Sequence, residues 1–118
     1  MPSRQLPKPK CLKRGGRITP DDSKYLRGRI EIKGPGEEVG EHRTAGKEEV
    51  LIVLEGTATV ILGRRVLKVR PGFALFIGEG TLHNVRNAGR KRLRYAYIRS
   101  LSEDERRARP FGHHPPHH

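Results

Sequence analysis

Short apolar segments separated by turn residues make up most of the sequence from residue 28 onward. Polar and apolar side chains alternate over residues 29–33, a pattern typical of a strand with one buried face. Turn signals recur at intervals of about eight to twelve residues, which predicts an all-β fold, a single small antiparallel β-barrel or sandwich. The other predicted strands are rich in β-branched and apolar residues and span residues 50–54, 57–62, 66–69, 73–77, 82–85 and 93–98.

Two of these segments are strongly apolar. Residues 50–54 carry no polar side chain, which predicts a strand that is covered on both sides, and residues 73–77 are expected to form another buried strand. One face of the 50–54 strand can meet the barrel interior. The other face needs a cover that a chain of 118 residues has little material to provide, so we expect a homodimer.

The length of 118 residues fits one domain with flanking segments. We assign residues 1–27 to a basic N-terminal arm interrupted by prolines, and residues 28–100 to the barrel. Residues 101–118 are predicted to form a short helix followed by a disordered, histidine-rich tail. Ser102 suits the N-cap of that helix, which is expected over residues 102–109 with acidic residues in its first turn.

The formal net charge of +12, from 25 Lys and Arg against 13 Asp and Glu, favours anionic partners. The arm carries half of this excess, but no aromatic side chain alternates with the basic ones of residues 4–17. Nucleic-acid binding is therefore expected to be weak and non-specific. Charged residues make up 32% of the chain while Asn and Gln are scarce, a composition typical of thermophilic proteins.

Other features argue against whole classes of protein. No run of about 18 apolar residues is present, so no membrane-spanning helix is expected. The N-terminus lacks the apolar stretch of a secretory signal, so a cytoplasmic location is expected. Cys11 is the only cysteine, and a single cysteine cannot build an internal disulfide framework.

Histidines are the candidate metal ligands, and only His42 and His83 lie in the predicted barrel. The other four stand in the C-terminal tail, where prolines and the chain end argue against a site with fixed ligands. These tail residues are His113, His114, His117 and His118.

His42 and His83 each belong to a spaced pattern. The first runs Gly36-x5-His42-x-Thr44-x4-Glu49-x6-Gly56, and the second runs Gly72-x5-Gly78-x-Gly80-x2-His83-x3-Asn87. These patterns resemble the paired motifs of the cupin family, Gly-x5-His-x-His-x(3 or 4)-Glu-x6-Gly and Gly-x5-Pro-x-Gly-x2-His-x3-Asn. Four of the five fixed positions match in each motif, and the resemblance covers residues 30–98.

The resemblance implies a jelly-roll barrel, also called a double-stranded β-helix, with a ligand pocket in its interior. In the family three histidines and one glutamate bind a divalent metal, and His42, Glu49 and His83 stand at three of these positions. Thr44 stands at the fourth, where its hydroxyl is expected to contact a metal-bound water or to leave a coordination position open. Gly78 replaces the motif proline at a turn. Two imidazoles and one carboxylate suit Fe, Mn, Zn, Ni or Co without choosing among them.

The residues themselves are consistent with this arrangement. His42 and Thr44 are two apart in an extended segment, so they point to the same face. Glu49 begins an apolar run, and a carboxylate that faces a barrel interior needs a cation or several hydrogen bonds. A metal-free cluster in which both histidines hydrogen-bond to Glu49 would also satisfy it, and both alternatives stay open. Tyr95 and Tyr97 share one face of a late strand and could line the pocket.

Two classes of function follow. The first is a metal-dependent enzyme, an isomerase, lyase or dioxygenase, that acts on a small polar molecule such as a sugar, sugar phosphate or organic acid. The second is a non-catalytic ligand-binding or sensor module without an essential metal. No catalytic residue is assigned, because Glu49 is the only candidate general base that the sequence places near the predicted metal.

Overall fold

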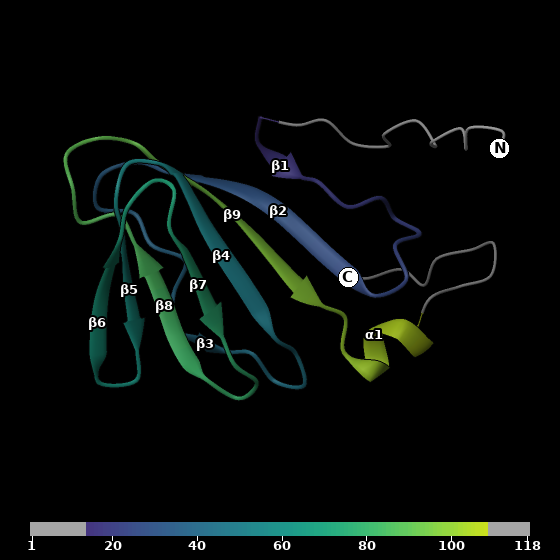
Figure 1. Ribbon diagram of the computed structural model, residues 1–118. Helices are drawn as coiled ribbons and strands as arrows, with labels where there is room; N and C mark the ends of the chain where they lie inside the picture. The colour runs from purple at the N-terminus through teal and green to yellow at the C-terminus, as the bar shows by residue number, and fades with distance from the viewer. Residues whose placement is uncertain (1–13, 109–118) are drawn as a thin grey trace, which may run out of the picture.

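The computed structural model describes residues 14–108, and these form two antiparallel β-sheets and one short helix (Figure 1). The predictions for residues 1–13 and for the histidine-rich tail, residues 109–118, lie outside the described residues. The elements are β1 (Gly16–Arg17), β2 (Leu26–Lys33), β3 (His42–Arg43), β4 (Glu49–Glu55), β5 (Ala58–Leu62), β6 (Arg65–Val69), β7 (Ala74–Ile77), β8 (Leu82–Arg86), β9 (Leu93–Ser100) and α1 (Glu103–Arg107).

The chain crosses repeatedly from one sheet to the other. The five-stranded sheet has the order β1-β2-β9-β4-β7, and the four-stranded sheet has the order β3-β8-β5-β6. From β3 onward only the β5–β6 hairpin stays within one sheet, and every other connection changes sheet. This alternation confirms the predicted all-β, jelly-roll architecture. No helix among the described residues is long and apolar enough to cross a bilayer.

Two glycines allow backbone paths that other residues would disfavour. Gly63 opens the β5–β6 turn with φ of 58°, as the first position of a type II′ hairpin turn requires. Gly56 has φ of 79°, and a Cβ atom there would lie 2.4 Å from the carbonyl oxygen of Arg92. The chain after β4 therefore passes against the start of β9 only because residue 56 has no side chain.

The hydrophobic core lies between the two sheets, where side chains of β4 and β9 meet those of β5, β6 and β8. Its buried members are Leu51, Val53, Ala58, Val60, Val69, Val85, Leu93 and Tyr95.

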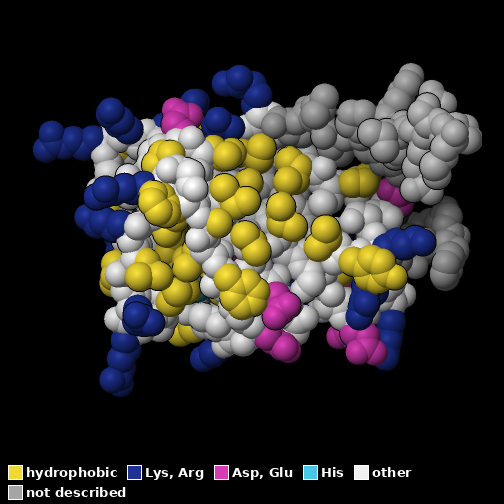
Figure 2. Space-filling view, viewed as in Figure 1, with side chains coloured by type: hydrophobic (Ala, Val, Ile, Leu, Met, Phe, Trp, Pro, Cys, Tyr) yellow, Lys and Arg dark blue, Asp and Glu magenta, His cyan; other side chains and the backbone are white. Residues whose placement is uncertain are grey.

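The outer face of the five-stranded sheet is apolar and lacks a cover from the described chain. Figure 2 shows hydrophobic side chains gathered over β4 and β9, with basic side chains around them. Cross-strand pairs share a face, so the strand register assigns this set to the side opposite the core. It comprises Leu26, Ile30, Ile32, Val50, Ile52, Phe76, Ala96 and Ile98. Together with the exposed Leu54, which lies at the β-bulge of β4, we call this set the outer apolar face.

This face corrects one sequence prediction and leaves another untested. Residues 73–77 do not form a buried strand: Phe73 and Phe76 are 64% and 60% exposed, and only Ile77 is buried. The reason is that β7 is the edge strand of the sheet and its outer side faces solvent. Within this one chain the inner side of β4 is buried, as Leu51 is, whereas Leu54 is 39% exposed, so the predicted cover of the outer side by a second copy stays a prediction.

The alternating strand at residues 29–33 has the opposite orientation to the one its pattern suggests. Glu31 pairs with Tyr95, which lies in the core, so the polar positions of β2 face the barrel interior. Ile30 pairs with Ala96 on the outer apolar face, and Ile32 is 46% exposed. Alternation established the strand, but it gave the wrong buried face.

The two ends of the domain are tied to the same sheet. Strand β1 pairs with β2, so the sheet extends into the segment that we assigned to the arm. At the other end, the predicted N-cap of α1 is confirmed: Ser102 accepts a hydrogen bond from the Glu105 amide, and the Glu105 carboxylate accepts one from the Ser102 amide. The helix lies directly beyond the end of β9 (Figure 1).

Candidate metal centre

The three ligands predicted from the sequence come together between the two sheets. His42 of β3 and His83 of β8 are direct cross-strand partners, and their ring centroids are 4.1 Å apart. Glu49 is the first residue of β4, in the other sheet. One ligand atom from each residue lies within 4.8 Å of the others. A single ion can therefore bridge the sheets at this point.

Both imidazoles present a free lone pair to this centre. The His42 Nδ1 atom lies 3.0 Å from the carbonyl oxygen of Gly40, and the His83 Nδ1 atom lies 3.0 Å from that of Thr81. A carbonyl oxygen can only accept, so each Nδ1 carries the proton and each Nε2 is left with its lone pair. The His83 Nε2 is the one buried side-chain nitrogen or oxygen of the described chain without a hydrogen-bond partner. Leaving it so is unfavourable, and a metal ion would satisfy it.

Glu49 supplies a buried negative charge beside these lone pairs. Glu49 is only 7% exposed. This burial raises the pKa of its carboxyl group, while nearby His83 and His42 act in the opposite direction. Among residues 14–108 no hydrogen bond joins Glu49 to either imidazole. The metal-free cluster that the sequence left open would need those bonds, and the two Nδ1 protons are directed elsewhere.

Thr44 is buried near the ligands, but its hydroxyl is already engaged. The Oγ1 atom donates to the Gly78 carbonyl oxygen at 2.6 Å and accepts from the Thr81 amide at 3.3 Å. These bonds fix the end of β3 to the turn between β7 and β8. Since the proton is used, Thr44 can act toward a bound water only as an acceptor.

A cavity of about 130 Å³ opens beside the three ligands. Tyr95 and Tyr97 line it, as the sequence suggested. Sequence reasoning missed the charged groups of its wall, Glu31, Arg43, Lys47 and Arg99. The polar alternation in β2 and the position of Arg99 within the largely apolar β9 were the available signals, and both fit solvent-facing positions equally well.

The sequence pattern of the cupin domain family matches residues 29–99, well over half of the chain. The chain belongs to the cupin family. No curated protein sequence matches it.

Several solved structures are similar to this cupin in fold. A protein from Thermus thermophilus is 22% identical, with a TM-score of 0.68 over 80% of this chain and 88% of that one. An RmlC-like cupin from Methanocaldococcus jannaschii with a double-stranded β-helix fold is 12% identical, with a TM-score of 0.68 over 92% and 97%. A sugar phosphate isomerase of the cupin superfamily from Silicibacter pomeroyi is 13% identical, with a TM-score of 0.60 over 66% and 52%. At these identities the likeness shows the fold alone.

Asn87 is a cupin motif residue that does not belong to the group of His42, Glu49 and His83. Asn87, the last position of the second motif, is 1% exposed and lies in the loop after β8. Its amide nitrogen donates to the carbonyl oxygens of Lys33 and Lys91, and its amide oxygen accepts from the Gly89 backbone. The residue therefore joins β2 to the β8–β9 loop and has a structural role.

Proposed function

We propose that this cupin binds one divalent metal ion through His42, Glu49 and His83 and binds or converts a small polar molecule in the adjoining cavity. The unpartnered Nε2 of His83 is the observation that carries the proposal, because a buried ring nitrogen without a partner, in a residue grouped with a carboxylate and a second imidazole, is suited to a cation. The donor set fits Fe, Mn, Zn, Ni or Co.

The chain's own residues prepare the centre in three ways. The Gly40 and Thr81 carbonyl oxygens hold the imidazoles in the ligating tautomer. Glu49 supplies negative charge in a partly desolvated position, where a cation offsets the cost of its burial. With three protein ligands, coordination positions remain for water and for a ligand, and the metal would supply Lewis-acid or redox chemistry there.

Within this proposal we favour an enzyme, an isomerase, lyase or dioxygenase. Glu31 lines the same cavity without belonging to the ligand set, so it offers a second carboxylate for proton transfer. The alternative is a non-catalytic ligand-binding or sensor module, and the observation that favours it is Thr44, which stands in place of the third histidine of the family's ligand set. Sugars, sugar phosphates and organic acids are the candidate ligands.

The metal is tested by elemental analysis of protein ending before His113, which removes the tail histidines and keeps all described residues. We expect near-stoichiometric divalent metal in this protein and its loss in His83→Ala. Thr44→Val is the matched control: it removes the bonds to Gly78 and Thr81 but no ligand, so metal should be retained. Metal that persists in His83→Ala, or none in the parent protein, would contradict the proposal.

We further propose that the outer apolar face is covered by a second copy of the chain. Phe76 and Leu54 are 60% and 39% exposed on this face, and an apolar surface of this extent favours association. Analytical ultracentrifugation at micromolar concentration should give the mass of a dimer, and Phe76→Lys should shift it toward the monomer. A monomeric parent protein would refute this assembly.

A further inference from the structure

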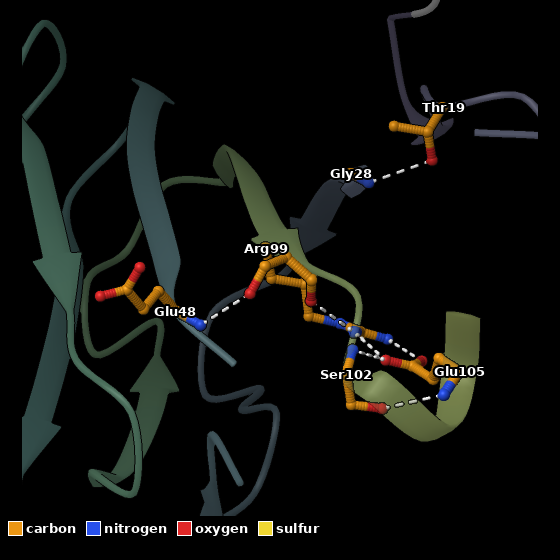
Figure 3. Close-up of polar contacts among 7 residues, drawn as sticks. Thr19, Gly28, Glu48, Arg99, Ser102 and Glu105 are labelled. Atoms are coloured by element: carbon orange, nitrogen blue, oxygen red, sulfur yellow. Dashed lines mark hydrogen bonds and ion pairs between the residues drawn. The ribbon is translucent and has the colours of Figure 1, made fainter. Parts of the chain in front are cut away.

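Arg99 is held at the cavity wall by the C-terminal helix. Its Nη1 and Nη2 atoms donate to the two carboxylate oxygens of Glu105 at 2.9 and 3.0 Å (Figure 3). The same carboxylate accepts from the Ser102 amide, so the helix cap and the ion pair stabilise each other. The Arg99 Nε and one Nη2 hydrogen have no partner among the described residues, so donors remain for a ligand.

Lys47 adds a second cation to the same wall. It lies in the loop between β3 and β4, is half-buried, and lines the cavity together with Arg99. No described residue forms an ion pair or hydrogen bond with its ammonium group. Burial raises the pKa of Glu49 and the Arg99 hydrogen bonds lower the pKa of Glu105, and the positive charge of Lys47 acts in the lowering direction on both carboxyl groups as a minor contribution.

The balance of charge around the cavity favours an anion. Arg99 is paired with Glu105, and Glu31 is paired with Arg29 at 3.5 Å, so these four charges largely cancel. Lys47 and the ligand Glu49 then remain, together with the exposed Arg43 at the cavity. Addition of a divalent cation beside Glu49 makes the space strongly positive.

The size of the cavity limits what it can enclose. Its volume of about 130 Å³ is slightly below that of an apolar cavity that accommodates benzene, about 150 Å³. A short organic acid is of this size, whereas a hexose phosphate is far larger. Size and charge therefore point to the same chemical class.

We propose that the cavity binds a small carboxylate anion, with Lys47 and the free donors of Arg99 as its charged anchor. This assignment rests on the proposed function, because it names the ligand of the same site. It makes Lys47 a specificity-determining residue, whose ammonium donates a charge-assisted hydrogen bond to the carboxylate.

Isothermal titration of the full-length protein with malonate and with malonamide tests this assignment. The two probes have the same number of heavy atoms, but only malonate is charged. Each is titrated into protein stripped of metal with chelator and into protein reloaded with Zn²⁺. We expect malonate to bind at least about tenfold more tightly than malonamide in both states, because each lost charge-assisted hydrogen bond weakens binding by about that factor.

Lys47→Met is the decisive variant. It removes the positive charge and keeps the length of the side chain. It breaks no side-chain hydrogen bond among the described residues, because the ammonium group forms none. It should weaken malonate binding about tenfold and leave malonamide unchanged. Lys68→Met is the matched control, because Lys68 is exposed on β6 and does not line the cavity. Its malonate affinity should equal that of the parent protein.

The outcomes separate this inference from the metal proposal. If the parent protein binds no Zn²⁺ but still binds malonate in a way that depends on Lys47, the metal proposal alone is overturned. Zn²⁺ binding with equal affinities for malonate and malonamide, or with Lys47→Met indistinguishable from the parent protein, would overturn the carboxylate assignment alone. Inorganic phosphate is titrated in parallel, and tighter binding of phosphate than of malonate would also overturn it.

Discussion

The interior of the barrel has an apolar end and a polar end, and β4 contributes to both. Leu51 and Val53 point inward and are 0% and 1% exposed, and they pack in the core. Glu49 points inward from the same strand, two residues before Leu51, and it meets His42 and His83 instead. Two successive inward-facing residues of β4 therefore belong to different parts of the interior: Leu51 to the core that stabilises the fold, and Glu49 to the group that can bind a ligand.

The two ends contribute to stability with opposite sign. At the apolar end, removal of side chains from water favours folding. At the polar end, burial raises the pKa of Glu49 and leaves the His83 Nε2 without a partner, and both disfavour the metal-free folded state. Hydrogen bonds around the site, such as that of Thr44 with Gly78, hold its geometry despite this cost.

The largest effect on the free energy of unfolding is expected from a substitution at the apolar end. Leu51→Ala removes a fully buried side chain from the core and should lower the free energy of unfolding by about 2–5 kcal/mol. Urea denaturation of metal-free protein measures this change. Metal binding by the folded fraction should persist, since no ligand is altered.

Val66→Ala is the control for this experiment, because Val66 is 61% exposed on β6. It should change the free energy of unfolding by no more than about 0.5 kcal/mol. If Leu51→Ala were equally mild, or if it abolished metal binding in folded protein, the two ends would not be separable.

A smaller, pH-dependent effect is expected beside the polar end, where Arg99 meets Glu105 of α1 and the contact stabilises the fold. The hydrogen bonds from Arg99 lower the pKa of Glu105 from its usual value near 4.5 to about 2. Because the folded-state value is depressed, this pair stabilises the protein above pH 4.5 and its contribution is lost as the pH falls toward 2. Glu105→Gln should therefore lower the free energy of unfolding by about 1–2 kcal/mol at pH 7.

Denaturation of the parent protein and Glu105→Gln at a series of pH values measures this difference. The gap between them should narrow steadily below pH 4.5 and vanish near pH 2. Leu51→Ala contains no ionisable change and should show the same loss at each pH. A gap for Glu105→Gln that did not depend on pH would mean that the ion pair with Arg99 contributes nothing to stability.

The sequence predicted the elements of the fold closely. Strands were expected at 50–54 and 93–98 and are found as β4 and β9, each slightly longer. Ser102 was identified as a helix N-cap from local chemistry alone, and its capping box is present. These features depend on residues near one another in the chain, where turn preferences, β-branching and capping act directly.

The charged wall of the cavity could not be predicted in the same way. Glu31, Lys47 and Arg99 come from β2, the β3–β4 loop and β9, and nothing in their local sequence distinguishes them from solvent-facing charges. The inverted face of β2 shows the same difficulty. Alternation reports that two faces differ, but the neighbouring strand and its register decide which face is buried.

By itself the sequence determined the strands, the turns that glycine permits, and the spacing that places His42, Glu49 and His83 at family motif positions. Only the tertiary structure decided how they act: the pairing of β3 with β8 sets the two imidazoles side by side, and the opposite sheet supplies Glu49. It also committed the Thr44 hydroxyl to the Gly78 carbonyl and placed Arg99 in the cavity wall, with its guanidinium paired to Glu105. The physical reason is that strand identity follows from local preference, whereas hydrogen-bond partners, burial and the sharing of charge depend on which distant segments meet.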